Sequence, residues 1–469
     1  MSKNKFYITT SIAYANAPPH IGFALELVQA DVIARYQQLL GKDVFFLTGT
    51  DEHGLKIARA AEKESKSPQE FVNAITVRFK KLKGALNLSN NDFIRTADKK
   101  RHWPTVKRIW EQLEKRGDIY KKKYKGLYCV GCEEFIKEKD LIDGKCPNHL
   151  KEPEIIEEEN YFFKLSNYAK QVKKEIKENK IRIIPESRKN EILSFIDQGI
   201  EDISCSRSKK KLKWGIPVPH DSNQVIYVWF EALINYLFPK KYWPADVHCV
   251  GKDIFRFHAL LWPAMLIALD LPRPKCILVH GFITSNGQKM SKSLGNVVDP
   301  FELVKKYGTD AVRYFLLREI PPTGDGDFTY EKFGRRHNAD LAGGLGNLVA
   351  RVIKLAPISN FQYPISNKFS NSNFQRIINT TKKTYYRALD EFKFNEALIA
   401  IWNLISFCDE YIDKEKPWQE SKKQKKIISN LLFTIKKIAE LLKPFLPETS
   451  ERISEQLKTK KSEILFPRI

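Results

Sequence analysis

The sequence predicts an α/β protein in which a parallel sheet is split by a small cysteine-containing insertion and followed by an α-helical bundle. Three observations lead to this prediction. The first residues alternate between strand-type and helix-type hydrophobic patterns. Three of the seven cysteines fall between Cys129 and Cys146. After about Asn338 strand-like runs stop, and helical periodicity continues as far as Leu442.

The N-terminal segment predicts a βαβ unit. Phe6–Ser11 is a run typical of a buried strand, and apolar residues recur with helical spacing from Leu25 to Leu39. Gly41 ends this helix, and Val44–Leu47 is the next strand. A strand, a helix and a strand of these lengths begin a parallel sheet.

The rest of the chain divides by changes of pattern. A charged segment with the cysteine cluster interrupts the sheet, and strands resume at Val225–Val228, His248–Val250 and Cys276–Val279. Helical patterns then cover Leu341–Ile353, Phe374–Leu389, Asn395–Tyr411 and Ile427–Leu442. We therefore expect a sheet domain from 1–116 and 208–285, an insertion from 117–207, a linking region from 286–337 and a helical domain from 338–469.

The insertion carries a metal-binding pattern. Cys129 and Cys132 are separated by two residues, as are Cys146 and His149, and thirteen residues lie between the pairs. Two chelating turns with this spacing predict a tetrahedral Zn²⁺ site with three thiolates and one imidazole. Protein atoms fill all four positions, so the zinc is expected to be structural and to stabilise a module too small for its own core.

Composition limits the cell compartment and the partners. A formal net charge of +23 favours a polyanionic partner, although a lysine-rich genome would also raise it. An odd number of cysteines argues against a disulfide framework and favours a reducing, cytoplasmic location. A strand begins almost at once, which leaves no room for a signal peptide. The longest apolar run, Ala259–Leu269, is too short to span a bilayer, so no membrane association is expected.

Two segments suit a nucleotide polyphosphate. His20 and Gly22 follow the first strand at a helix N-terminus, where backbone N–H groups and the helix dipole attract anions. Far along the chain, Lys289 and Lys292 lie on a loop, Gly287–Asn296, that could close over phosphates. The alternatives to phosphate binding are that His20 only caps the helix and that Gly287–Asn296 is an ordinary solvated loop.

Together, His20-Ile21-Gly22 and Lys289-Met290-Ser291-Lys292-Ser293 resemble the paired motifs of class I aminoacyl-tRNA synthetases. The resemblance narrows to the methionyl-tRNA synthetases and covers almost the whole chain. It rests on further stretches: Tyr14–Asn16, Thr48–Gly54, Tyr227–Ala232, Gly251–Ile254, Phe257–His258 and Asn347–Arg351.

This resemblance implies the fold and activity. It implies a Rossmann-like catalytic domain split by a zinc knuckle and followed by an anticodon-binding bundle. The expected activity is ligation of L-methionine to tRNA(Met) with ATP, through methionyl-adenylate, and Mg²⁺ is expected with the ATP. Because the chain stops soon after the bundle, we expect a monomer.

The resemblance also assigns roles to single residues. His20, Lys289 and Lys292 would be catalytic, and would bind ATP with Gly22, Gly251 and Asp253. The methionine pocket would consist of Ile12, Tyr14, Asp51, Trp229, Ala232, Tyr236, Phe257 and His258, with Asp51 on the substrate ammonium. The anticodon would meet Asn347, Arg351, Pro417 and Trp418, although Trp418 could instead belong to the core of the bundle.

Two positions depart from the family pattern. Phe23 stands where a second histidine is usual, and Glu231 stands where aspartate is usual. Because of Phe23, one alternative is a synthetase-like protein that binds RNA but has lost catalytic activity. A class I synthetase for cysteine, leucine or valine is the other alternative. It is disfavoured because the chain has no large editing insertion and because the zinc ligands lie apart from the pocket residues.

Overall fold

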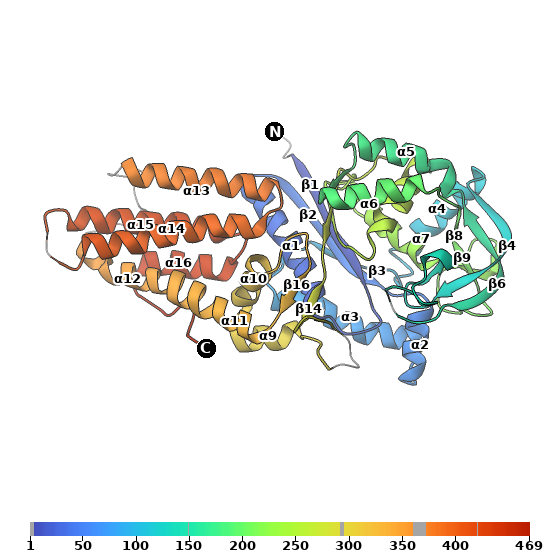
Figure 1. Cartoon of the computed structure of the whole chain (residues 1–469), viewed down its shortest axis with the longest axis horizontal. Helices are drawn as coiled ribbons and strands as arrows, with labels where there is room; N and C mark the ends of the chain where they lie inside the picture. The colour runs from blue at the N-terminus through green and yellow to red at the C-terminus, as the bar shows by residue number, and fades with distance from the viewer. Residues whose placement is uncertain (1–3, 149, 291–294, 360–371, 420) are drawn as a thin grey trace. The chain divides into compact units, whose positions relative to one another are not determined.

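The computed structural model describes residues 4–148, 150–290, 295–359, 372–419 and 421–469 (Figure 1). They divide into two compact units, and the chain passes between them more than once. Unit 1 comprises Met1–Pro19, Gly41–Lys81 and Asn90–His280, and unit 2 comprises His20–Leu40, Leu82–Ser89 and Gly281–Ile469. Among the helices in these ranges, none combines the length and the apolar character needed to cross a membrane.

Unit 1 is built on a six-stranded sheet in which all neighbouring strands are parallel. Across the sheet the strands are β3 (Asp92–Arg95), β2 (Asp43–Asp51), β1 (Lys5–Tyr14), β12 (Val247–Gly251), β13 (Cys276–His280) and β7 (Arg182–Ile184). Four of the predicted strands are thereby confirmed. The chain builds outward from β1 in both directions, so the strand order reverses between β1 and β12. In open parallel sheets, ligands bind beyond the carboxyl ends of the strands at such a reversal.

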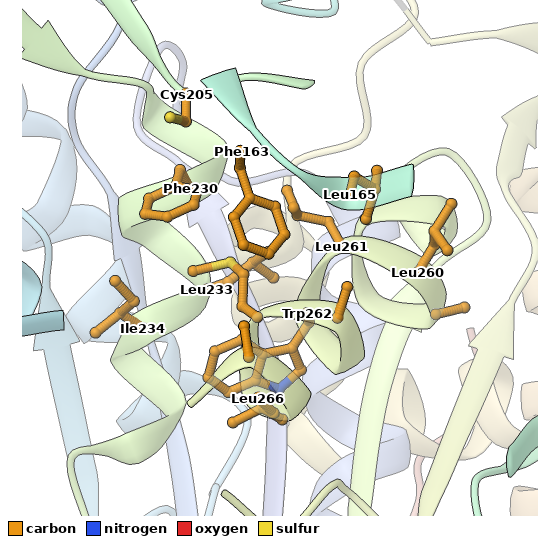
Figure 2. Close-up of a cluster of buried hydrophobic side chains, with 14 of the residues drawn as sticks. Phe163, Leu165, Cys205, Phe230, Leu233, Ile234, Leu260, Leu261, Trp262 and Leu266 are labelled. Atoms are coloured by element: carbon orange, nitrogen blue, oxygen red, sulfur yellow. The ribbon is translucent and has the colours of Figure 1, made fainter. Parts of the chain in front are cut away.

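Helices and a buried apolar cluster complete unit 1. The helices are α2 (Leu55–Lys63), α3 (Pro68–Ala85), α4 (Trp103–Lys115), α5 (Leu165–Lys177), α6 (Glu186–Asp197), α7 (Val228–Ala232) and α8 (Trp262–Ala268), with the short η1 (Glu138–Asp140), η2 (Leu233–Leu237) and the π-helix η3 (Phe257–Leu261). Figure 2 shows Phe230 of α7 beside Phe163, and Trp262 of α8 above Leu266. The rings of Phe163 and Phe230 meet edge to face with centroids 5.9 Å apart. This core holds α7 and α8 in place.

Two small antiparallel sheets also belong to unit 1. One runs in the order β5 (Glu134–Ile136), β4 (Ile119–Cys129), β6 (Glu154–Phe163) and β8 (Ile203–Ser204), and the other in the order β10 (Pro217–Val218), β11 (Asp221–Ile226) and β9 (Ser206–Ser208). The predicted strand Val225–Val228 was therefore partly wrong: β11 ends at Ile226 in an antiparallel sheet, and α7 begins at Val228. Strand β7, at the edge of the parallel sheet, comes from within the expected insertion 117–207.

Unit 2 is mostly helical. It contains α1 (Ile21–Leu39), a small sheet of β15 (Gln288–Lys289), β14 (Ile283–Ser285) and β16 (Gly326–Phe328), then α9 (Pro300–Tyr307), α10 (Thr309–Arg318), α11 (Tyr330–Arg336), η5 (His337–Gly346), α12 (Asn347–Leu355), η6 (Ala356–Ser359), α13 (Ser372–Asp390), α14 (Phe394–Glu415), α15 (Gln424–Leu442) and α16 (Pro447–Thr459). Helices α13 to α16 form a bundle (Figure 1). The four predicted helical segments of this region are confirmed, whereas α16 was not predicted.

A buried ion pair joins α1 to the helical part of unit 2. The Arg313 guanidinium and the Asp31 carboxylate are both fully buried, and Nη2 lies 2.8 Å from Oδ2. The guanidinium also donates to the carbonyl oxygens of Leu86, Pro444 and Phe445. A buried charge is tolerated when its hydrogen-bonding groups are satisfied in this way. The network fixes α1, whose N-terminus carries His20.

Candidate functional site

A cavity opens at the carboxyl ends of β1 and β2, beside the reversal in strand order. It is partly open to solvent and is lined by Ser11, Ile12, Asp51, Trp229, Ala232, Leu233, Asn235, Tyr236 and His258. Ile12 and Asp51 come from the strand ends, and Trp229 and Ala232 come from α7. The structure thus brings six of the eight expected pocket residues together. Ser11, Leu233 and Asn235 were not foreseen, because nothing in their residue types or spacing distinguishes them from core residues.

The other two expected pocket residues stand behind the lining. The Phe257 ring stacks on Trp229 with centroids 4.2 Å apart and planes 6° apart. The Tyr14 hydroxyl donates to Glu133 Oε1 at 2.9 Å. Phe257 and Tyr14 therefore support the wall of the cavity.

The charge of the cavity is set by Asp51. Burial raises the pKa of its carboxyl well above the usual range, and the negative charge of Glu231 raises it further. A carboxylate in this position is short of positive partners, and an ammonium group bound beside it would relieve the repulsion. The cavity therefore favours a small ligand that carries a cation at one end.

The opposite wall of the cavity is neutral. His258 Nδ1 donates to the Ile254 carbonyl at 3.0 Å, because a carbonyl oxygen can only accept. The ring nitrogen Nε2 then accepts from the Tyr236 hydroxyl at 2.8 Å. Burial lowers the pKa of His258 to about 4, so the ring is uncharged at neutral pH. Neutral rings suit an apolar, polarizable group such as a thioether.

Glu231 holds two histidines behind the cavity. Its carboxylate oxygens lie 2.7 Å from His53 Nδ1 and 2.7 Å from His102 Nε2, and all three side chains are buried. Burial disfavours the charged carboxylate, but His53 and His102 outweigh it and lower the pKa of Glu231. The glutamate in place of the usual aspartate therefore has well-formed partners. The network joins α7 and α4 to the loop that follows Asp51.

The proposed phosphate-binding residues of unit 2 lie at the N-terminus of α1. His20 is the N-cap, and its Nδ1 accepts from the Gly22 N–H at 3.1 Å. A neutral His20 ring therefore carries its proton on Nε2, as a donor for an anion. A Cβ on Gly22 would lie 2.8 Å from His20 Cε1, so a larger residue at this position would displace the ring from its present place.

The loop with the lysines borders the same N-terminus. The Ile21 N–H donates to the Val298 carbonyl at 3.0 Å, and Asn296 Nδ2 donates to the Lys289 carbonyl at 3.2 Å. Lys289 is exposed on β15. Lys292 lies outside the described residues.

In unit 1, Gly251 ends β12 and Asp253 follows it, exposed to solvent. A Cβ on Gly251 would lie 2.8 Å from Asp253 Oδ1, so glycine leaves room for this carboxylate. An exposed carboxylate at the end of a parallel strand suits hydroxyl donors such as those of a ribose.

Three cysteines gather at the end of β4. The sulfur atoms of Cys129, Cys132 and Cys146 all lie within 4.8 Å of one another, and Cys132 Sγ lies 3.6 Å from Cys146 Sγ. Tetrahedral Zn²⁺ with Zn–S bonds of about 2.3 Å places its sulfurs about 3.8 Å apart, so the thiols fit zinc. The fourth expected ligand, His149, lies outside the described residues.

We predict one tightly bound zinc per chain. Cys129→Ala is expected to reduce the bound metal to near zero and to expose β4 and β6 to proteolysis, because the metal replaces a hydrophobic core here. Metal analysis and limited proteolysis check this. Cys408→Ala, which removes a buried thiol of the bundle, is the matched control and is expected to keep its zinc. Full metal content in Cys129→Ala would contradict the assignment.

The expected anticodon residues lie in the helical part of unit 2. Trp418 is 52% exposed between α14 and α15, so it does not belong to the core of the bundle. Asn347 is exposed at the start of α12, and Arg351 follows one turn later. Arg351 Nη2 lies 2.6 Å from Asp413 Oδ1 near the end of α14. Pro417 is buried, and its carbonyl accepts from Gln424 Nε2 at 3.1 Å, which fixes the turn below Trp418.

Family models match most of the chain. The model for class I tRNA synthetases (M) matches residues 6–152 and 149–353, and the model for the anticodon-binding domain of tRNA ligases matches residues 372–467.

Individual relatives agree with these models. The methionine–tRNA ligase of Caldanaerobacter subterraneus subsp. tengcongensis is 43% identical over 100% of this chain and 79% of its own length. The enzyme of Thermotoga maritima is 42% identical over 96% of this chain and 74% of its own. The solved structure of Mycobacterium tuberculosis methionyl-tRNA synthetase in complex with methionyl-adenylate superposes with a TM-score of 0.91 at 36% identity, covering 99% of this chain and 98% of that one.

Proposed function

The chain belongs to the methionyl-tRNA synthetase family, and we infer that it activates L-methionine with ATP and transfers it to the 3′ end of tRNA(Met). The observation that carries this function most directly is the cavity at the strand ends. It has a buried carboxylate at one end and neutral aromatic and imidazole groups at the other. This arrangement matches the ammonium and the thioether of methionine.

We propose roles for the residues in the first step. Asp51 binds the ammonium, and Ile12, Trp229, Ala232, Tyr236 and His258 enclose the side chain. A carboxylate oxygen of methionine then attacks the α-phosphorus of ATP, and the bond to pyrophosphate breaks. His20 Nε2 and the ammonium groups of Lys289 and Lys292 donate to the phosphate oxygens, where charge increases. One well-placed donor of this kind contributes about 2.7–4 kcal/mol.

The remaining ATP contacts and the second step complete the proposal. Gly22 and Gly251 have no side chain, so the nucleotide can lie directly against their backbone. The Asp253 carboxylate accepts a hydrogen bond from a ribose hydroxyl. Mg²⁺ accompanies the polyphosphate and neutralises part of its charge. In the second step the terminal ribose hydroxyl of tRNA attacks the methionyl carbonyl, and AMP leaves. We propose that a monomer carries out both steps in the cytoplasm, since one chain supplies every group named here.

Zinc has a structural part in this scheme. The three thiols, with His149 as the proposed fourth ligand, would hold it at the end of β4. When bound, it cross-links the turn after β4 to the segment around Cys146. No bond of the substrate is made or broken there.

Aminoacylation of a tRNA(Met) transcript with labelled methionine tests the proposed function. We expect attachment of methionine, and we expect a transcript with an altered anticodon to be a much poorer substrate. Attachment of a different amino acid would contradict the assignment.

We predict that the enzyme is active despite Phe23 and that Phe23→His accelerates adenylate formation. Phe23 occupies the third position of α1, and its N–H donates to the His20 carbonyl at 3.0 Å. A histidine there would add one charge-assisted hydrogen bond to the phosphates, which is worth about 1.5–3 kcal/mol at most, or roughly tenfold to a hundredfold in rate. Single-turnover formation of the adenylate measures it. Phe23→Ala is the control, since it adds no donor. An unchanged rate in Phe23→His would show that the site has adapted to phenylalanine.

A further inference from the structure

Glu133 is a buried carboxylate that directly follows the metal-binding Cys132. Its side chain is only 3% exposed, and its backbone has φ +57°, in the left-handed region that non-glycine residues rarely adopt. Oε1 accepts from the Tyr14 hydroxyl at 2.9 Å and from the Lys56 N–H at 2.6 Å. Oε2 accepts from the Tyr128 hydroxyl at 2.7 Å. A buried charge held in a strained conformation by three donors indicates a fixed task.

The same turn holds a second residue of the cavity wall. The Trp229 indole N–H donates to the Cys132 carbonyl at 3.4 Å, and Trp229 lines the cavity while stacking on Phe257. Two aromatic side chains at the cavity, Tyr14 and Trp229, thus donate hydrogen bonds to two consecutive residues of the metal-binding turn. Neither contact is explained by packing within the insertion alone.

The space around the Glu133–Tyr14 hydrogen bond is filled. A Cβ on Gly54 would lie 2.5 Å from the Tyr14 hydroxyl oxygen and 2.9 Å from Glu133 Oε1. Gly54 is the N-cap of α2 and has φ +108°, so its backbone runs directly against the hydrogen bond. The Lys56 N–H belongs to the first turn of α2, whose positive dipole end favours a carboxylate. Glu133 therefore fixes the start of α2 as well as Tyr14, just after Asp51.

We infer that Glu133 is a positioning residue for methionine: with the Cys132 carbonyl, it holds Tyr14 and Trp229 so that the metal-binding turn supports the wall of the pocket. The inference rests on the proposed function, since it takes the cavity as the methionine site. Glu133 does not touch the substrate and acts through Tyr14.

The inference predicts a selective loss. Without the carboxylate, Tyr14 loses a hydrogen bond to a charged acceptor, and such bonds contribute about tenfold to a hundredfold to an equilibrium. We therefore expect the KM for methionine to rise by up to this factor. The KM for ATP is expected to stay within about twofold, because the phosphate-binding residues His20 and Lys289 are held by other contacts.

Two substitutions at Glu133 separate positioning from folding. Asn tolerates the left-handed backbone but is too short to reach Tyr14, so Glu133→Asn removes the contact and keeps the turn. Gln keeps the length and one carbonyl acceptor, so Glu133→Gln is expected to restore part of the affinity. Tyr128→Phe removes only the hydrogen bond on the far oxygen and is the matched control, with a near-normal KM for methionine.

The experiment measures each full-length variant with its metal in place. The KM values for methionine and ATP come from ATP–pyrophosphate exchange, methionine binding without ATP comes from tryptophan fluorescence, and metal content is determined on the same samples. We expect Glu133→Asn to weaken methionine binding in both assays at full metal content. Adding Tyr14→Phe to Glu133→Asn is expected to cause no further loss, because both changes remove the same bond.

Three results would overturn the inference. They are a normal KM for methionine in Glu133→Asn, equal rises in the KM for methionine and for ATP, and loss of metal together with affinity. The last two would show that Glu133 serves folding alone. A wild-type enzyme that shows no exchange with methionine would instead contradict the proposed function, whatever the Glu133 variants do.

Discussion

Asp51→Asn is expected to raise the KM for methionine by roughly 140-fold to 3,700-fold. This corresponds to about 3–5 kcal/mol, the usual cost of removing one partner of a buried ion pair, converted at about 1.4 kcal/mol per tenfold. Asp51 is 4% exposed, and burial and Glu231 raise its pKa, so we expect a bound ammonium to stabilise its charged form. Asparagine has the same shape but no charge, so the change tests the charge and not the packing.

Three measurements isolate the effect of Asp51. The KM for ATP is expected to stay unchanged, because Asp51 lines the cavity that we propose for methionine. The inhibition constant of methylthiobutyrate, which lacks the α-amino group, is expected to be similar for both enzymes. The melting temperature is not expected to fall, since the substitution removes an unfavourable buried charge. Equal losses for methionine and methylthiobutyrate would mean that Asp51 shapes the cavity and does not bind the ammonium.

Trp418→Ala is expected to reduce kcat/KM for aminoacylation by about 5-fold to 150-fold, the equivalent of about 1–3 kcal/mol of base stacking. Methionine-dependent ATP–pyrophosphate exchange is expected to remain unchanged. The Trp418 indole is 52% exposed and contributes little to the core of the bundle. Its removal is therefore expected to weaken tRNA binding and to leave the bundle stable. Steady-state aminoacylation with varied tRNA measures the effect.

The matched control for Trp418 is Tyr330→Ala. Tyr330 is also an exposed aromatic residue of unit 2, 61% exposed at the start of α11, and has no proposed contact with the anticodon. Its loss is expected to leave aminoacylation near normal. If exchange falls in parallel with aminoacylation in Trp418→Ala, the residue is structural and the anticodon assignment is wrong.

Local periodicity predicted most of the elements that carry the site. β1, α1 and β2 were predicted because a buried strand leaves a short, continuous run of strand-forming residues and a long helix leaves apolar residues with a period of 3.6. The pattern failed where an element is short or polar. β7 has three residues, and its place in the sheet depends on pairing with β13, which local sequence does not encode. In α16, a charged sequence hides the few buried positions, such as Ile453 and Leu457.

Only the site residues that belong to recognisable family motifs were predicted from the sequence. Resemblance named Asp51, Trp229 and His258, and the structure places them around one cavity. The buried pairing of Glu231 with His53 and His102 was not foreseen, since the three residues are separated in sequence by up to 178 positions. Glu133 was missed for a related reason. An acidic residue beside a metal ligand is normally solvated, and only the fold shows that it faces Tyr14.

ATP–pyrophosphate exchange, measured with methionine and with each of the other protein amino acids, tests the central claim most directly. The assay requires the proposed methionine cavity and the proposed phosphate-binding residues to work together, and it does not involve tRNA. We predict rapid exchange with L-methionine and little with any other amino acid. A close thioether or thiol analogue is expected to be rejected incompletely, since an apolar pocket discriminates by only about 1–3 kcal/mol per methylene. Exchange driven by a different amino acid, or no exchange by the zinc-loaded enzyme, would contradict the account.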